Sequence, residues 1–203
     1  MSSKLKKKGK NKFFTKSDLQ GVRDYAKRVN NTDKLISDSY CNIKMIAFQI
    51  LHDKFGFGNK RISRLDEHMD RFLEDVEVQK KSTKELEDYL IERCKVDARA
   101  EANMVPFRER FAITKYKIHP ESQRQAGQTL LASIFVSFLA LGICLKEDFK
   151  FSANQIKKAY WHIRDYINTL SRYKQFELTL DGVAESLFED VKYRVGQFKD
   201  GEL

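Results

Sequence analysis

Two stretches of this chain, Met45–Val76 (MIAFQILHDKFGFGNKRISRLDEHMDRFLEDV) and Leu139–Leu170 (LALGICLKEDFKFSANQIKKAYWHIRDYINTL), align without a gap. The alignment sets these pairs opposite one another at a constant spacing: Phe55 with Phe149, Phe57 with Phe151, Ile62 with Ile156, His68 with His162 and Leu73 with Ile167. Similarity of a sequence to itself at a fixed spacing indicates a repeated supersecondary unit. We therefore expect an internal duplication.

The repeated unit is predicted to be helical. Apolar residues in both stretches recur at spacings of three and four, which is the period of an amphipathic helix. The chain has only two prolines and nine glycines, and such a low content of helix-breaking residues favours helices. We expect an all-α protein of two similar three-helix units, packed as one helical domain behind a basic flexible N-terminal tail.

The composition suggests four segments. They are a basic tail (1–16), a helical unit with the first repeat (17–95), a connector with both prolines (96–120) and a helical unit with the second repeat (121–203). In the first unit, Asn30–Thr32 is expected to separate a helix that starts near Ser17 from a longer helix over 33–54. In the second unit, the closing helix is expected over 181–198.

The positive charge is concentrated at the N-terminus. Of the formal net charge of +9, residues 1–16 contribute seven lysines and no acid, so the remainder carries about +2. A lysine-rich segment of this kind attracts phosphates and is poorly ordered alone. The alternative is a terminus that only improves solubility.

One segment, 126–145, has no charge over twenty residues and is long enough to span a bilayer. Its own serines and threonine oppose a membrane span, as do Asn42, Lys44 and Gln49 in the matching helix of the first repeat. We expect a buried central helix over 126–147. The three cysteines, which lack metal-ligand spacing, are expected to be reduced thiols.

The repeated turn contains helix-entry signals. Ser152 followed by Gln155 predicts a capping box, with Phe151 and Ile156 as the hydrophobic staple. Phe57, Gly58 and Ile62 occupy the same places in the first repeat. Gly56, Gly58, Lys60 and Arg61 occur only in the first repeat and, with Arg64, could bind an anion at a helix N-terminus. The alternative is a set of exposed charges.

No catalytic motif is evident. Asp66, Glu67, Asp70, Glu74 and Asp75 could in principle bind metal for a nuclease, but their spacing favours the solvent face of a helix. His68 and His162 flank apolar stripes and are expected at the boundary of the core or in solvent. We therefore expect a protein that is not an enzyme, with no metal site and no cofactor.

Aromatic and basic residues alternate in two places, Arg108–Lys117 and Tyr160–Tyr173, as in proteins that bind single strands or RNA. Trp161 is expected in the core or at an interface. The predicted nucleic-acid-binding residues are Lys6, Lys7, Lys8, Lys10, Lys12, Lys60, Arg61, Arg64, Arg108, Arg110, Lys115 and Lys117.

The stretch Ile50–Ile62 (ILHDKFGFGNKRI) resembles a pattern in small helical proteins of phages and prophages of Firmicutes, L-H-D-x-F-G-F-G-x-K-R. The resemblance covers about thirty residues, and the second repeat keeps only its apolar positions. It implies a mobile-element protein in the cytoplasm of a bacterial host and no particular activity.

These observations favour a phage accessory protein that binds nucleic acid or a nucleoprotein complex, with no membrane and with homodimerisation as an option. An inhibitor of host defence that targets a protein, as anti-CRISPR proteins do, is the first alternative. A metal-dependent nuclease is the second.

Overall fold

The computed structural model describes residues 16–78, 82–173 and 178–195, with side chains described from Asn31 onward. This part of the chain is all helical and contains no strand. Its elements, in order, are α1 (Lys16–Phe55), α2 (Asn59–Glu77), α3 (Thr83–Cys94), α4 (Ala98–Asn103), η1 (Glu109–Ile113), η2 (Pro120–Ser122), α5 (Gln123–Glu147), α6 (Ala153–Tyr173) and α7 (Leu180–Val191). The 1–16 tail, apart from Lys16, lies outside the described residues.

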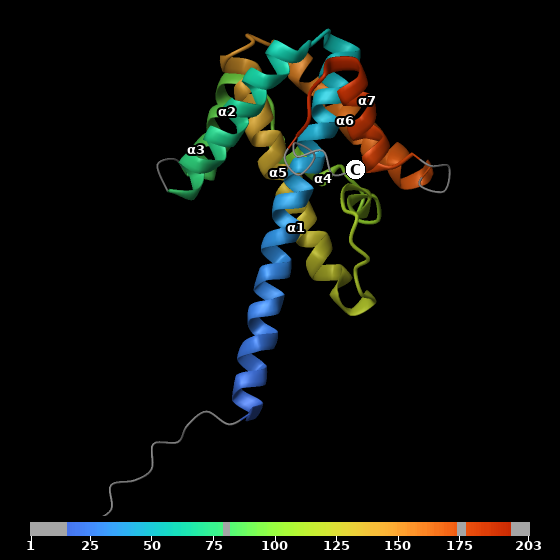
Figure 1. Ribbon diagram of the computed structural model, residues 1–203. Helices are drawn as coiled ribbons and strands as arrows, with labels where there is room; N and C mark the ends of the chain where they lie inside the picture. Colours follow the sequence, from blue (N-terminus) through green and yellow to red (C-terminus); the bar gives the residue numbers. More distant parts are fainter. Residues whose placement is uncertain (1–15, 79–81, 174–177, 196–203) are drawn as a thin grey trace, which may run out of the picture.

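Two long helices, α1 and α5, pack against each other at the centre of the molecule (Figure 1). Each is followed by a turn, a second long helix, a loop and a helix of twelve residues. The α2 and α3 helices pack on α5, whereas α6 and α7 pack on α1, so each segment lies against the long helix of the other. The N-terminal part of α1 extends away from this body (Figure 1).

The contacts between the two segments are reciprocal. Phe55 packs on Phe151 with ring centroids 5.3 Å apart, and Phe57 packs on Phe149 at 4.9 Å. Ser39 donates a hydrogen bond of 2.8 Å to Ser133, 94 positions further on. The core is continuous across both segments, because buried residues of α1, α2, α5 and α6 belong to one cluster.

The turns after α1 and α5 are built alike. Phe57 N–H donates to the Leu51 carbonyl at 3.1 Å, and Phe151 N–H donates to the Leu145 carbonyl at 2.9 Å. This 6→1 bond needs a residue with positive φ just before it, as in a Schellman motif. Gly56 supplies it with φ of 66°, and Lys150 supplies it with φ of 56°.

The predicted helix-entry signals are confirmed. Ser152 Oγ accepts from Gln155 N–H at 3.3 Å, and the Gln155 side chain accepts from Ser152 N–H at 2.9 Å. Ser82 and Glu85 form a second capping box at the start of α3. Gly58 precedes α2 without a side-chain cap.

Three predicted boundaries are wrong or incomplete. The break at Asn30–Thr32 is absent, because α1 is one helix of 40 residues that runs through these positions. The closing helix ends at Val191, where Lys192 takes a left-handed conformation. The 96–120 connector contains three short helical pieces, α4, η1 and η2.

The uncharged segment forms α5, and Pro120–Glu147 is long and apolar enough to cross a membrane. In this structure 67% of its most apolar window is buried by the rest of the protein. The matching residues Asn42, Lys44 and Gln49, whose polar side chains argued against a membrane span, are buried as well. Each has a polar partner: the Ile113 carbonyl, a carboxylate pair and Asp53, respectively.

Candidate nucleic-acid interface

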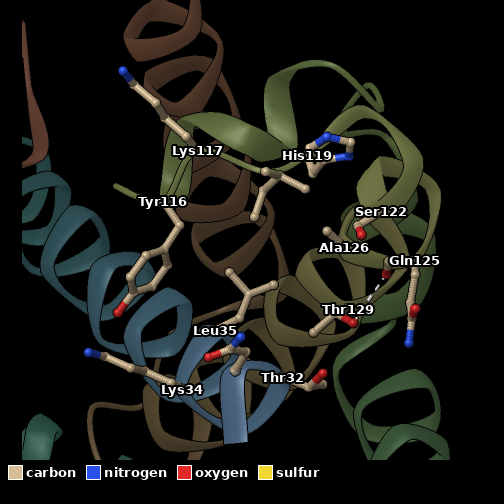
Figure 2. A pocket seen from close by; sticks show the side chains of 12 residues that line it. Thr32, Lys34, Leu35, Tyr116, Lys117, His119, Ser122, Gln125, Ala126 and Thr129 are labelled. Carbon is tan, nitrogen blue, oxygen red and sulfur yellow. Dashed lines mark hydrogen bonds between the residues drawn. The ribbon is translucent and has the colours of Figure 1, made fainter. Parts of the chain in front are cut away.

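A cavity of about 370 Å³ opens between the middle of α1, the segment 116–119 and the start of α5 (Figure 2). Leu35 and Ala126, each 7% exposed, supply apolar surface inside it. The basic residues at its edge are Lys34, Lys117 and His119. Among the described residues that line it, none is an aspartate or a glutamate.

The Tyr116 ring is the exposed aromatic surface of this cavity. It is 39% exposed; in Figure 2 Lys34 lies beside it, whereas the Lys117 side chain extends away from the ring. The Lys34 ammonium lies 5.6 Å from the ring centroid, a cation–π distance. The Tyr116 hydroxyl donates to Asp38 on α1, and this hydrogen bond raises the pKa of the phenol. The ring is thus fixed at its far end, beside the Lys34 ammonium.

Local sequence explains how the cavity forms. Pro120 opens the 3-10 turn η2 immediately after His119, and Ser122 N–H donates to the His119 carbonyl at 2.9 Å. This turn reverses the chain into α5, so residues 116–119 run beside α1. Tyr116 N–H donates to Thr114 Oγ1 at 3.2 Å, which fixes the chain just before the cavity.

The other predicted bases of this region serve different contacts. Arg110 donates to the carbonyls of Val105 and Gly127, and burial lowers the pKa of its guanidinium. Lys115 pairs with Asp181 at the start of α7. Arg108 is exposed beside η1. Of the four predicted residues between 108 and 117, Lys117 alone lines the cavity.

A second predicted group, Lys60, Arg61 and Arg64, lies exposed on the first two turns of α2. Arg61 lies over the Phe57 ring at 5.6 Å, and Arg64 lies over the Phe149 ring at 5.7 Å. The structure does not bring these residues next to the cavity, which lies along the middle of α1 (Figure 1). Lys6, Lys7, Lys8, Lys10 and Lys12 lie outside the described residues.

The glycine turn is less open to an anion than the sequence suggested. Gly56 N–H donates to the His52 carbonyl at 3.0 Å, and Phe57 N–H is bound to Leu51. Both groups therefore close the end of α1. The shared Phe57–Ile62 pair is buried, with exposures of 1% and 0%, as expected of a staple.

The acidic residues of α2 do not form one solvent face, so that expectation is wrong for Asp66. Asp66 is 1% exposed, pairs with buried Lys44 and accepts a hydrogen bond of 2.7 Å from Tyr193. Lys44 also binds Asp70 at 2.6 Å. Burial lowers the pKa of Lys44, but the two carboxylates outweigh it and the net pKa is raised. Sequence alone could not reveal this network, because Lys44 looks like any surface lysine.

The histidines and the tryptophan occupy boundary and surface positions. His68 Nδ1 lies 2.6 Å from Asp148, whereas burial and then Lys54 lower the pKa of His162. Trp161 is 53% exposed, so it does not belong to the core. The three cysteines are free.

No protein-family model, curated protein or solved structure matches this chain. The resemblance to phage proteins therefore stays a prediction.

Proposed function

We propose that this protein binds single-stranded nucleic acid without being an enzyme, and that the cavity beside Tyr116 receives a base and its phosphates. The observation that carries the proposal is the exposed Tyr116 ring beside the Lys34 ammonium, at a cavity that Lys117 also lines and that has no lining carboxylate among the described residues. Stacking on an aromatic ring beside cations suits single strands, because every base has a π face. The lysine-rich N-terminal sequence precedes α1, whose middle lines the cavity, and would add phosphate contacts.

The test is the affinity for a fluorescent single-stranded oligonucleotide, measured by anisotropy at several salt concentrations. Tyr116→Ala is expected to cost about 1–3 kcal/mol of binding free energy through lost stacking. The logarithm of the binding constant falls linearly with the logarithm of the salt concentration, and each single-strand phosphate contact contributes about 0.7 to the steepness of that line. The double variant Lys34→Ala with Lys117→Ala should therefore reduce the slope by about 1.4. Lys157→Ala with Lys158→Ala removes two exposed lysines of α6 and is the matched control. Equal affinities and slopes in all variants would reject the proposal.

A second candidate is a protein-targeted inhibitor of host defence. Trp161 and Met104, 53% and 58% exposed, border a hollow of about 340 Å³ with Arg164 and Arg172. Tryptophan, methionine and arginine are the residue types enriched at protein interfaces. Affinity capture from a bacterial host lysate treated with nuclease should then retain one stoichiometric protein, and Trp161→Ala should lose it. The α2 carboxylates do not favour a nuclease, because Asp66 is buried and paired.

We also propose that the chain arose by tandem duplication of one three-helix unit and acts in a phage or prophage, in the cytoplasm of the bacterial host. The spacing of 94 residues between matched positions, the reciprocal phenylalanine contacts and the Ser39–Ser133 hydrogen bond support a twofold relation between the units. In a homodimer of a single three-helix unit, the same reciprocal contacts would join the two copies as they join the two units of this chain. The segments 17–95 and 121–203 are the proposed units, with 96–120 joining them.

A further inference from the structure

We propose that the ends of α1 and α7 form a binding site for a divalent first-row cation, Zn²⁺ or Mn²⁺. The ligands would be His52, Asp53 and Asp190. One ligand atom of each lies within 4.8 Å of the others, although Asp190 is far from the other two in the sequence. This site is separate from the Tyr116 cavity: Leu35 and Asp53 are 18 residues apart on α1, or about 27 Å along a helix.

The histidine is oriented for a metal. His52 Nδ1 lies 2.9 Å from the Phe57 carbonyl, and because a carbonyl only accepts, Nδ1 carries the hydrogen. The lone pair is therefore on Nε2. Metal-binding histidines commonly donate their second ring nitrogen to a carbonyl or carboxylate in this way.

Gln49 is a second, independent observation. It is 5% exposed, and its amide faces the two carboxylates: Nε2 lies 3.0 Å from Asp53 Oδ1 and 3.5 Å from Asp190 Oδ2. Its Oε1 has no hydrogen-bond partner among the described residues. A rotation of the Gln49 side-chain amide by 180° exchanges Nε2 and Oε1. A buried oxygen would then face a cation held between the two carboxylates. The resulting set of one nitrogen and three oxygens suits Zn²⁺ or Mn²⁺.

The electrostatics of the site also favour a cation. Asp53 and Asp190 occupy the last turns of two helices, where the helix dipole opposes negative charge. The last turn of α7 contains no basic residue. Asn59 donates to the carbonyls of Val191 and Lys192 at 3.1 and 3.0 Å, and thereby holds the end of α7 beside the turn after α1.

The other segment shows that the fold does not require this arrangement. The positions that match Gln49, His52 and Asp53 are Ile143, Lys146 and Glu147. The helices α3 and α7 align at a spacing of 97 residues, which sets Leu90 opposite Leu187, so the position that matches Asp190 is Arg93. The second segment therefore has the apolar Ile143 in place of the buried Gln49. It has two basic residues, Lys146 and Arg93, and one carboxylate, Glu147, in place of the proposed ligands. Only the first segment gathers two carboxylates around a buried polar group.

The test uses the full chain with ZnCl₂ and with MnCl₂, followed by calorimetry and thermal unfolding. We expect one ion bound per chain and a higher Tm, since a ligand that binds the folded state stabilises it. Asp53→Asn with Asp190→Asn should weaken binding at least tenfold without lowering the Tm of the metal-free protein, because it removes a like-charge pair. Glu147→Gln, at the matched position, should bind as the unmodified chain does.

A second measurement needs no variant. Bound Mn²⁺ should broaden the amide NMR signals of residues 49–59 and 186–192 and leave those of residues 32–35, about 27 Å or more away along α1, sharp. Failure of both ions to bind saturably, equal binding by the double variant, or broadening spread evenly over the chain would overturn the proposal.

Discussion

The same two positions of the fold hold a buried ion pair in one segment and a stacked aromatic pair in the other. Lys44 and Asp66 pair in the first segment at side-chain exposures of 3% and 2%. At matched positions, Phe138 and Tyr160 stack with ring centroids 4.5 Å apart and an interplanar angle of 4°. The fold thus accepts either chemistry here, provided that the pair is complete.

A second pair of positions compensates for the difference in size. Tyr160 is fully buried, and Gly142 beside it leaves the space that its ring fills. In the first segment the small Asp66 replaces the tyrosine, and Phe48, fully buried, replaces the glycine. Because interiors are close-packed, a large residue at one position requires a small one at the other. Volume is therefore conserved between the segments, whereas charge is not.

The largest expected effect comes from breaking the ion pair. Lys44→Met leaves Asp66 buried without its cation and should lower the free energy of unfolding by about 3–5 kcal/mol. Urea unfolding followed by circular dichroism measures this. Lys60→Met, at an exposed position, is the control and should change stability by less than about 0.5 kcal/mol.

The paired replacement Lys44→Met with Asp66→Leu removes both charges. It should recover most of the lost stability, because apolar residues of similar volume often replace a buried pair without cost. A double variant that is less stable than Lys44→Met alone would show that the first segment requires the charges themselves.

The next effect tests the conserved volume. A methyl group added by Gly142→Ala would collide with Tyr160 Oη, and Leu90 Cδ1 lies 3.1 Å away, so the substitution should cost about 1–3 kcal/mol. Tyr160→Phe removes the colliding oxygen, and Gly142→Ala should cost less in that background. The matched control is Gly127→Ala, whose obstacle is Phe107, 42% exposed and able to move. Equal losses for Gly142→Ala and Gly127→Ala in urea unfolding would contradict this account.

Periodicity, the uncharged segment and one local motif in the sequence were enough to predict the helical class, the central buried helix and the capping box at Ser152. These features depend on neighbours within one or two turns, which the sequence displays directly. The break at Asn30–Thr32 was wrongly predicted, because asparagine and threonine disfavour a helix by at most about 0.7 kcal/mol each and do not by themselves end it.

The cavity and the buried network could be predicted only in part. Lys117 was identified from its basic and aromatic neighbours, whereas Lys34 comes from α1 and no local pattern marks it. Lys44 and Asp66 were assigned to the surface, because charged residues are rarely buried. Only the three-dimensional pairing of α1 with α2 shows why they are buried here.

A smaller effect concerns the two turns. Gly56→Ala places a side chain at φ of 66° and should cost about 1–2 kcal/mol, whereas Lys150→Gly relieves φ of 56° and should raise stability by up to about 1 kcal/mol. Thermal unfolding of each variant shows whether its stability falls, as expected for Gly56→Ala, or rises, as expected for Lys150→Gly. Gly58→Ala is the control, because Gly58 has φ of −89° and a methyl group there meets no atom within 4 Å. Destabilisation by Lys150→Gly would show that the lysine side chain, and not the backbone, stabilises its turn.

The smallest expected effect distinguishes the two matched histidines. His68 faces Asp148, whereas the position that matches Asp148 is Lys54, which together with burial lowers the pKa of His162. A histidine whose pKa is lower in the folded state favours folding when neutral, so its contribution is present above the unfolded pKa of about 6.5 and is lost as pH falls below it. His162→Gln should therefore reduce the loss of stability between pH 7 and pH 5, measured by urea unfolding at each pH. An unchanged slope in His162→Gln would mean that Lys54 and burial do not distinguish this histidine from its match, and the difference between the segments would then be confined to their cores.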